Sequence, residues 1–174
     1  KSPFCCVIDP GYEADTILDK LSELGLTLEA ILLTHGHFDH VGAVRQLAAD
    51  TGCQVYLCAE DLTMPPQLTA GKLYYTQTYA EGAQLHLAGL DITVLQTPGH
   101  TPGSVCLLIG DTLFSGDTLF SGSCGRTDLP GGSWAQMQAS LKRLSQIEAN
   151  LWVLPGHGES TMLASEKKYN PYLR

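Results

Sequence analysis

The stretch Thr34-His35-Gly36-His37-Phe38-Asp39-His40 places three histidines and one aspartate within six residues. Each neutral imidazole offers a nitrogen to a borderline metal ion, and each aspartate offers an anionic oxygen. A lone histidine is usually a surface or core residue with its hydrogen bonds satisfied, but four such side chains in one short window need another explanation. The stretch therefore predicts a metal site.

Three further side chains of the same types follow apolar runs later in the chain and end at corners rich in Gly and Pro. They are His100 in Thr97-Pro98-Gly99-His100-Thr101-Pro102-Gly103, Asp117 in Ser115-Gly116-Asp117, and His157 in Pro155-Gly156-His157-Gly158. Of the six histidines, only His86 lies outside this set. Seven candidate ligands are too many for one tetrahedral ion, and they fit two ions that share a bridging aspartate.

Length and charge narrow the class of protein. A chain of 174 residues predicts one domain over 1–174, long enough to bury a substantial core. The net charge of −8, with no long run of Lys or Arg, repels phosphate backbones, so nucleic acid is not an expected partner. No window approaches 18 uninterrupted apolar residues, so no membrane span is predicted. The expected partner is a small molecule, and the sequence carries no signal for an oligomeric state.

The cysteines and the N-terminus bear on the compartment. The six cysteines form no Cys-x-x-Cys pair, and most lie in or beside apolar stretches: Cys5, Cys6, Cys53, Cys58, Cys106 and Cys124. This pattern favours reduced thiols in a cytosol over a disulfide framework, and the predicted location is cytoplasmic. No signal peptide is visible, but the chain lacks an initiator Met and opens almost directly on a strand. That is the pattern expected of a trimmed chain, from which a targeting segment could have been lost.

Hydrophobic periodicity predicts alternating strands and helices, which indicates an α/β protein. Strands are expected over 5–8, 30–33, 54–58 and 151–154, and helices over 15–24, 40–49, 133–147 and 162–169. Two hairpins, 84–87 with 91–96 and 104–109 with 112–115, exclude a purely parallel sheet. The region 59–81 is expected to be a loop with one short helix and a patch of tyrosines, Tyr74, Tyr75 and Tyr79. Packing on the surface is the favoured interpretation of this region, and a wall of the substrate cleft is the alternative. Every candidate ligand lies just past a predicted strand.

The motifs resemble those of a known family. His35-x-His37-x-Asp39-His40 resembles the signature of the metallo-β-lactamase superfamily. Ser121-Gly122-Ser123-Cys124-Gly125-Arg126-Thr127-Asp128-Leu129-Pro130-Gly131-Gly132 is similar to a Gly-Arg-Thr-Asp signature shared by small glyoxalase II-like proteins and persulfide dioxygenases. The tail, Pro155-Gly156-His157-Gly158 through Asn170-Pro171-Tyr172-Leu173, is typical of the former. The resemblance runs from about Cys6 to Leu173 and implies a four-layer αβ/βα sandwich, expected here to lack its first strands.

The resemblance also implies a role for each ligand. His35, His37 and His100 would hold one divalent ion, Asp39, His40 and His157 would hold a second, and Asp117 would bridge them. The ions are expected to be zinc, with iron or manganese as alternatives, because mixed nitrogen and oxygen ligands suit all three. Asp39 and Asp117 are the carboxylates assigned to the catalytic centre. Asp9 is expected to support a ligating histidine or to be only the first residue of a turn.

The predicted reaction is hydrolysis of an acyl thioester, with S-2-hydroxyacylglutathione as the implied substrate. The motifs contain no further His, Glu or Lys to act as a general acid, which favours a substrate whose leaving group departs as an anion. A thiolate can do so because its conjugate acid has a pKa of about 8.5. Arg126 would anchor a substrate carboxylate, or else form an internal salt bridge with Asp128. Full-length glyoxalase II enzymes carry a further C-terminal helical domain with basic residues that bind glutathione. The sequence ends at Arg174, soon after the last ligand, so the resemblance leaves the recognition of glutathione open, although small relatives without that domain are also classed as glyoxalase II-like.

Two alternatives remain at this point. The first is a persulfide dioxygenase with a single Fe(II) held by His35, His100 and Asp117, a two-His, one-carboxylate set. The second is a metal-binding regulatory domain without turnover.

Overall fold

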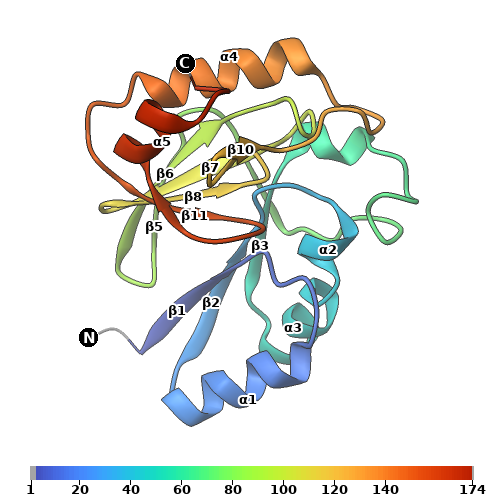
Figure 1. Cartoon of the computed structure of the whole chain (residues 1–174). Helices are drawn as coiled ribbons and strands as arrows, with labels where there is room; N and C mark the ends of the chain where they lie inside the picture. The colour runs from blue at the N-terminus through green and yellow to red at the C-terminus, as the bar shows by residue number, and fades with distance from the viewer. Residues whose placement is uncertain (1–2, 174) are drawn as a thin grey trace.

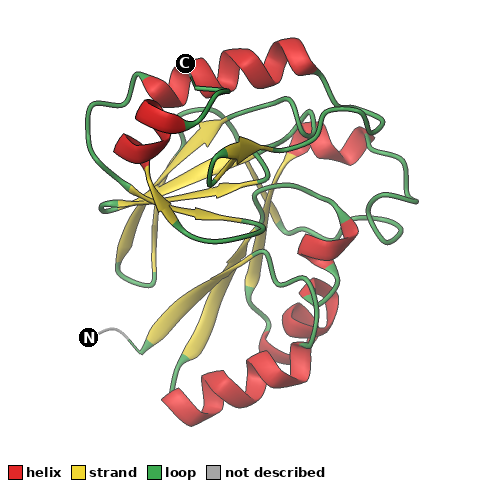
Figure 2. Ribbon diagram, viewed as in Figure 1, coloured by secondary structure: helices red, strands yellow, loops and turns green. Residues whose placement is uncertain are grey.

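The computed structural model describes residues 3–173, in which two β-sheets pack face to face with helices on both outer faces (Figures 1 and 2). The order of layers is helix, sheet, sheet, helix. Residues 4–79 build the first sheet with its helices, and residues 84–169 build the second sheet with its helices (Figure 1). This arrangement confirms the α/β class and the four-layer αβ/βα sandwich expected from the resemblance.

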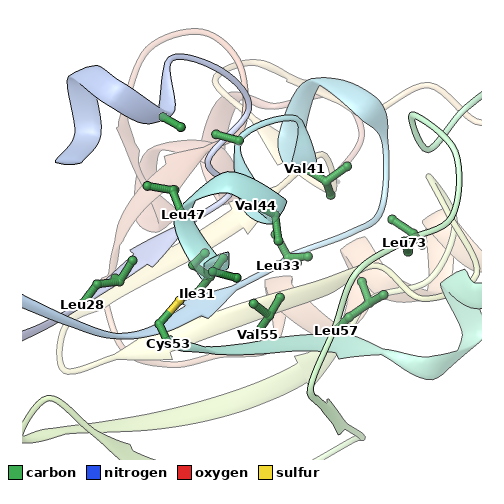
Figure 3. Close-up of a cluster of buried hydrophobic side chains, with 13 residues drawn as sticks. Leu28, Ile31, Leu33, Val41, Val44, Leu47, Cys53, Val55, Leu57 and Leu73 are labelled. Atoms are coloured by element: carbon green, nitrogen blue, oxygen red, sulfur yellow. The ribbon is translucent and has the colours of Figure 1, made fainter. Parts of the chain in front are cut away.

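The first sheet is entirely parallel. Its strands, in spatial order, are β1 (Phe4–Ile8), β2 (Thr27–Leu32), β3 (Gln54–Cys58) and β4 (Gln77–Tyr79). The amphipathic helices α1 (Ala14–Leu24) and α3 (Val44–Thr51) pack against it, and each ends at a glycine with a positive φ, as helix C-termini commonly do. Ile31 of β2 and Leu47 of α3 are fully buried in the cluster between these helices and the sheet (Figure 3).

The second sheet is mixed. Its spatial order is β12 (Thr161–Met162), β11 (Trp152–Pro155), β8 (Thr112–Gly116), β7 (Val105–Ile109), β6 (Leu90–Gln96) and β5 (Gln84–Leu87). The pairings are antiparallel except for the parallel pair of β8 and β11. Helices α4 (Trp134–Ser145) and α5 (Leu163–Tyr169) pack on its outer face through a second apolar cluster. Ser133 caps the N-terminus of α4, since its hydroxyl accepts a hydrogen bond from Gln136 N–H.

The two sheets bury a third apolar cluster between them. Alternate residues of β2 belong to different clusters. Ile31 packs in the cluster beneath the helices of the first sheet, whereas Ala30 and Leu32 pack in the cluster between the sheets. Ile92 and Val94 of β6 meet them from the other side, and all five side chains are fully buried. Burying a Leu or Ile side chain contributes about 1.5–3 kcal/mol, so the position of one sheet on the other is strongly specified.

The prediction of one helix over 40–49 is wrong in one respect, because this part of the chain forms two helices. The short α2 (Phe38–Val41) ends at Gly42, and α3 begins at Val44. The loop after β1 crosses at this point, where Ala43 N–H donates to Pro10 C=O at 3.0 Å. A Cβ at Gly42 would collide with the Gly11 carbonyl oxygen, so the chain can pass only because Gly42 has no side chain.

The region 59–81 is more ordered than its sequence suggested. It begins with the short 3₁₀ helix η1 (Ala59–Thr63) and ends with β4, a strand that the sequence did not predict. Tyr74 and Tyr75 are partly exposed, as expected, but Tyr79 is buried and its hydroxyl donates to Leu33 C=O. The expectation of surface packing was therefore wrong for Tyr79, because strand pairing carries this residue into the space between the sheets.

All six cysteines are free, in agreement with the prediction of reduced thiols. Within residues 3–173, no helix is both long enough and apolar enough to cross a membrane.

Candidate metal centre

Four loops bring the seven predicted ligands to one place, and each loop follows a strand. His35, His37, Asp39 and His40 follow β2, and the other three follow β6, β8 and β11: His100, Asp117 and His157. These strands belong to both sheets, so the site forms only when the two halves of the sandwich are assembled.

The first subset consists of His35, His37 and His100, whose ligand-capable nitrogens lie within 4.8 Å of one another. His37 Nδ1 is 2.9 Å from His100 Nε2, and the ring centroids of His35 and His100 are 4.8 Å apart. His37 has extended backbone angles, so the rings at positions 35 and 37 project from the same side of the chain. All three side chains are buried.

The second subset consists of Asp39, His40 and His157, whose ligand atoms meet the same limit of 4.8 Å. His157 Nε2 lies 3.2 Å from Asp39 Oδ2 and 3.3 Å from His40 Nε2. The His40 side chain is buried, whereas that of His157 is 54% exposed. The second subset therefore borders solvent, while the first lies deeper.

Asp117 stands between the two subsets. Its Oδ2 lies 3.4 Å from His100 Nε2, and its Oδ1 lies 3.5 Å from His40 Nε2. Strand β8 ends immediately before it at Gly116, where φ is +48° and where a Cβ would collide with the Thr34 side chain. The glycine therefore allows the sharp exit that turns Asp117 toward both subsets, which is the position that a bridging carboxylate requires.

Three buried polar atoms of this cluster have no hydrogen-bond partner: His35 Nε2, His37 Nε2 and Asp117 Oδ1. Leaving a buried donor or acceptor unsatisfied costs roughly 1–3 kcal/mol, so such atoms are rare in proteins. Here they belong to side chains that all point toward the same place. Divalent metal ions satisfy these atoms, and the nitrogen and oxygen ligands suit zinc, iron or manganese.

The protonation states of His35 and His37 are suited to metal binding. Burial, together with the neighbouring imidazoles, lowers the pKa of His35 well below its usual range, and burial lowers the pKa of His37 to about 4. Both rings are therefore neutral near pH 7 and can offer a lone pair to a metal. Burial raises the pKa of Asp117, although the surrounding histidines oppose that shift.

Asp9 is hydrogen-bonded to His40, which agrees with one of its two predicted roles, the support of a ligating histidine. It follows β1, and its Oδ2 lies 3.0 Å from His40 Nδ1. The same carboxylate accepts hydrogen bonds from Thr34 N–H at 2.7 Å and from the Thr34 hydroxyl at 2.6 Å. Burial lowers the pKa of His40, but the Asp9 hydrogen bond and nearby carboxylates outweigh it, and the pKa is raised. Asp9 thus orients the His40 ring so that its other nitrogen, Nε2, faces the site.

The sequence did not indicate Asp61, which is fully buried beside the first subset. Its carboxylate accepts hydrogen bonds from Gly36 N–H and Gly103 N–H. The residue belongs to η1, in the region expected to be mostly loop, and no nearby motif marked it. Only the folded chain brings Asp61 to the metal loops.

A cleft of about 540 Å³ opens onto the cluster. Its apolar lining includes Phe38, Leu68, Phe120 and Leu129, and its polar lining includes five of the seven ligands: His37, Asp39, His100, Asp117 and His157. Leu68 belongs to the region 59–81, for which a wall of the substrate cleft was the alternative interpretation, although no motif marked this residue. Its carbonyl accepts a hydrogen bond from Phe38 N–H at 2.8 Å.

Arg126 also lines this cleft, where it forms one of its two predicted interactions, the salt bridge with Asp128. Its Nε and Nη2 donate to the two carboxylate oxygens of Asp128 at 2.6 and 2.8 Å, so the salt bridge with Asp128 is present. The hydrogen bonds from Arg126 lower the pKa of Asp128 to about 2. The Arg126 carbonyl lies 2.8 Å from His100 Nδ1, so the Gly-Arg-Thr-Asp loop contacts a candidate ligand directly.

His86 lies outside the cluster, as predicted. It is on β5, and its ring pairs with Asp91 at 2.8 Å on the exposed surface.

Known proteins share this sequence pattern over nearly the whole chain. A family model described as the metallo-beta-lactamase superfamily matches residues 4–157. Among curated proteins, hydroxyacylglutathione hydrolase GloC of Haemophilus influenzae is 35% identical over 188 residues, which cover 96% of this chain and 86% of the relative.

Solved structures agree closely with the fold but carry different names. BLEG-1, described as a B3 metallo-beta-lactamase, is 33% identical with a TM-score of 0.91, covering 98% of this chain and 89% of its own. TTHA1623, in a di-iron-bound form, is 40% identical with a TM-score of 0.86 and coverages of 95% and 88%. ETHE1 from Myxococcus xanthus is 31% identical with a TM-score of 0.84 and coverages of 97% and 73%.

The names therefore identify the superfamily and do not decide the substrate. Four loops that follow strands gather seven His and Asp side chains at one site. The family model, the curated relative and the solved structures all match the chain that builds this site. The chain therefore belongs to the metallo-β-lactamase superfamily of metal-dependent hydrolases.

Proposed function

We propose that this protein is a binuclear metal-dependent hydrolase of acyl thioesters that acts on S-2-hydroxyacylglutathione or a similar substrate. The name of the Haemophilus influenzae relative supports this reaction. The lining of the cleft supports it independently, and that lining is the observation on which the proposal depends.

The two ligand subsets are suited to hold two divalent ions, with Asp117 shared between them. We assign zinc, with iron or manganese as alternatives. When bound, such ions lower the pKa of water toward neutrality and polarise a carbonyl oxygen. The protein contributes a converging set of imidazoles and carboxylates, and Asp9 fixes the orientation of His40.

The cleft offers a leaving group little help with protonation. Among the described residues that line it, the titratable side chains outside the ligand set are Cys124 and Arg126. Burial raises the pKa of Cys124, and Arg126 stays charged beside Asp128. A thiolate departs without a proton from the protein because its conjugate acid has a pKa of about 8.5, whereas an amide nitrogen must be protonated. The lining therefore favours thioesters over amides and lactams.

The apolar walls have a role in positioning. Phe38 is 49% exposed beside Asp39, and Phe120 of the short strand β9 (Leu119–Phe120) lines the same cleft. The ring centroids of Phe120 and His157 are 6.3 Å apart. These rings can hold the carbon chain of an acyl group over the ligands and reduce the access of bulk water.

A matched set of substrates tests the proposed reaction. The acyl group is kept constant as a thioester, an oxygen ester and an amide, with a β-lactam added, and each is assayed with metal-replete protein. We expect the thioester to have the highest kcat/KM, at least about a hundredfold above that of the amide. A factor of this size is the usual lower limit of the rate enhancement from general acid–base catalysis. Equal or faster turnover of the lactam would contradict the proposal.

The Arg126→Ala variant tests the anchoring of a glutathione carboxylate. If Arg126 binds the substrate, KM for a glutathione thioester should rise on the order of tenfold with kcat little changed, the pattern of lost uniform binding. An uncharged thioester should show almost no change. Steady-state kinetics of both substrates measure the difference.

The matched variant is Asp128→Ala, which leaves the cation in place and removes its partner. If Arg126 anchors substrate, Asp128→Ala should not raise KM. If both variants instead lose activity toward both substrates and melt early, the Arg126–Asp128 pair is structural and the anchoring role is wrong.

The persulfide dioxygenase remains a second candidate, because the Gly-Arg-Thr-Asp loop that suggested it contacts His100 through the Arg126 carbonyl. That reading needs one iron on His35, His100 and Asp117, so the number of bound metals separates it from the hydrolase. A regulatory domain without turnover would not need a cleft of about 540 Å³ that opens onto the ligands.

A further inference from the structure

Asp61 makes three hydrogen bonds with a carboxylate that is fully buried. Its Oδ2 accepts from Gly36 N–H at 2.8 Å and from the Thr101 hydroxyl at 3.1 Å, and its Oδ1 accepts from Gly103 N–H at 2.6 Å. Burying a carboxylate is costly unless hydrogen bonds compensate for the lost water. The bonds to Asp61 are therefore a strong constraint on the groups that donate them.

The three donors lie on the two loops that carry the first subset of ligands. Gly36 stands between His35 and His37, and Thr101 directly follows His100. The first loop leaves the parallel sheet and the second connects β6 to β7 in the mixed sheet. One side chain thus joins ligand loops from opposite halves of the sandwich, through two backbone N–H groups and one hydroxyl.

Glycine at both backbone positions permits this close approach. A Cβ at Gly103 would lie 2.7 Å from Asp61 Oδ1, and a Cβ at Gly36 would lie 2.8 Å from Leu73 Cδ1. Met64 and Leu73 pack closely against the Gly36 backbone, to which Asp61 is hydrogen-bonded. The loop is fixed by a hydrogen bond and by close packing.

We propose that Asp61 is a positioning residue that sets the separation of His35 and His37 from His100, and thereby the affinity of the first metal subset. The proposal rests on the metal centre described under Proposed function but not on the choice of substrate. Partners that orient ligands typically change metal affinity about 10- to 100-fold when they are removed.

The test is the zinc affinity of the Asp61→Asn variant, measured by competition with a chromophoric chelator. An amide has one oxygen and one NH₂, so it cannot accept from Gly36 and Gly103 on separate oxygens as the carboxylate does. Glu166→Gln is the matched control. Glu166 is also a buried carboxylate that accepts three hydrogen bonds, from Gly122 N–H, the Thr161 hydroxyl and Asn170 Nδ2, and it contacts none of the ligands.

We expect Asp61→Asn to bind zinc at the first subset at least tenfold more weakly than the unaltered protein does. The zinc affinity of Glu166→Gln should stay within about twofold of that of the unaltered protein. The thermal stability of both metal-free variants is measured alongside. Unchanged zinc affinity in Asp61→Asn would overturn the proposal, as would an equal loss in the two variants. Zinc affinity is measured without substrate, so this result is independent of whether thioesters are hydrolysed.

If Asp61→Asn does not fold, Thr101→Val decides the question, because it removes the hydroxyl that donates to Asp61, together with that hydroxyl's bond to the Ser104 hydroxyl, and keeps the shape of the side chain. Ser104→Ala, which removes the second of these bonds but not the first, is its control. A folded Thr101→Val protein with zinc affinity reduced by a few fold supports the proposal. A folded protein with unaltered affinity overturns it.

Discussion

Replacing Asp117 with alanine is expected to remove thioester hydrolysis and to lower the metal content of the purified protein. Asp117 Oδ2 faces His100 and its Oδ1 faces His40, so the substitution deletes a ligand from both subsets at once. Removing a residue that only orients a ligand typically lowers metal affinity or activity about 10- to 100-fold. Removing a ligand that both subsets share should therefore lower kcat/KM by more than about 100-fold. Steady-state kinetics and elemental analysis of the same sample measure the two effects.

The control for this variant is His86→Ala. His86 is exposed on β5 and pairs with Asp91, so its loss should leave both activity and metal content nearly intact. Comparable losses from the two substitutions would mean that the ligand assignment is wrong.

A second large effect is expected from one added methyl group at Gly156. The Gly156 backbone does not have a positive φ, but a Cβ there would lie well under 3 Å from Asp117 Oδ1 and 2.7 Å from His40 Cε1. Both atoms belong to side chains that can move aside in the metal-free protein. We therefore expect Gly156→Ala to fold but to displace two ligands, with activity reduced by at least about a hundredfold and weaker metal binding.

Gly158→Ala is the matched variant in the same loop. Gly158 has φ of +83°, and nothing lies within 4 Å of the position of its Cβ. An alanine there should cost about 1 kcal/mol in the free energy of unfolding, through backbone strain alone, with activity changed by less than a few fold. Calorimetry and kinetics distinguish the two variants. If Gly156→Ala retained full activity, the cluster around Asp117 and His40 would not be the reactive centre.

The parts of this site that could be predicted are those carried by local sequence. His35, His37, Asp39 and His40 are close in sequence, and an extended segment leading into a helix necessarily keeps them close in space. His100, Asp117 and His157 each stand in a Gly/Pro corner after an apolar strand, so their delivery to one edge follows from the layered fold. The family resemblance supplied their partition into two subsets.

The parts that escaped prediction depend on contacts between distant segments. The break between α2 and α3 at Gly42 is caused by the loop after β1, which no helical periodicity records. Asp61 and Leu68 lie in the region 59–81, whose turn-rich sequence gives no sign of the loops that it contacts. Tyr79 reads as one of several surface tyrosines, and its burial follows only from the pairing of β4 with β3.

The central claim is that two metal ions share Asp117 in a thioester hydrolase. Its most direct test is to measure the metal content and the turnover of one metal-replete sample, with thiol release and oxygen uptake followed in parallel. The account predicts close to two equivalents of metal per chain and release of thiol from an acyl thioester without oxygen uptake. A preparation that never exceeds one equivalent, and that takes up oxygen with glutathione persulfide through a single iron, would contradict it.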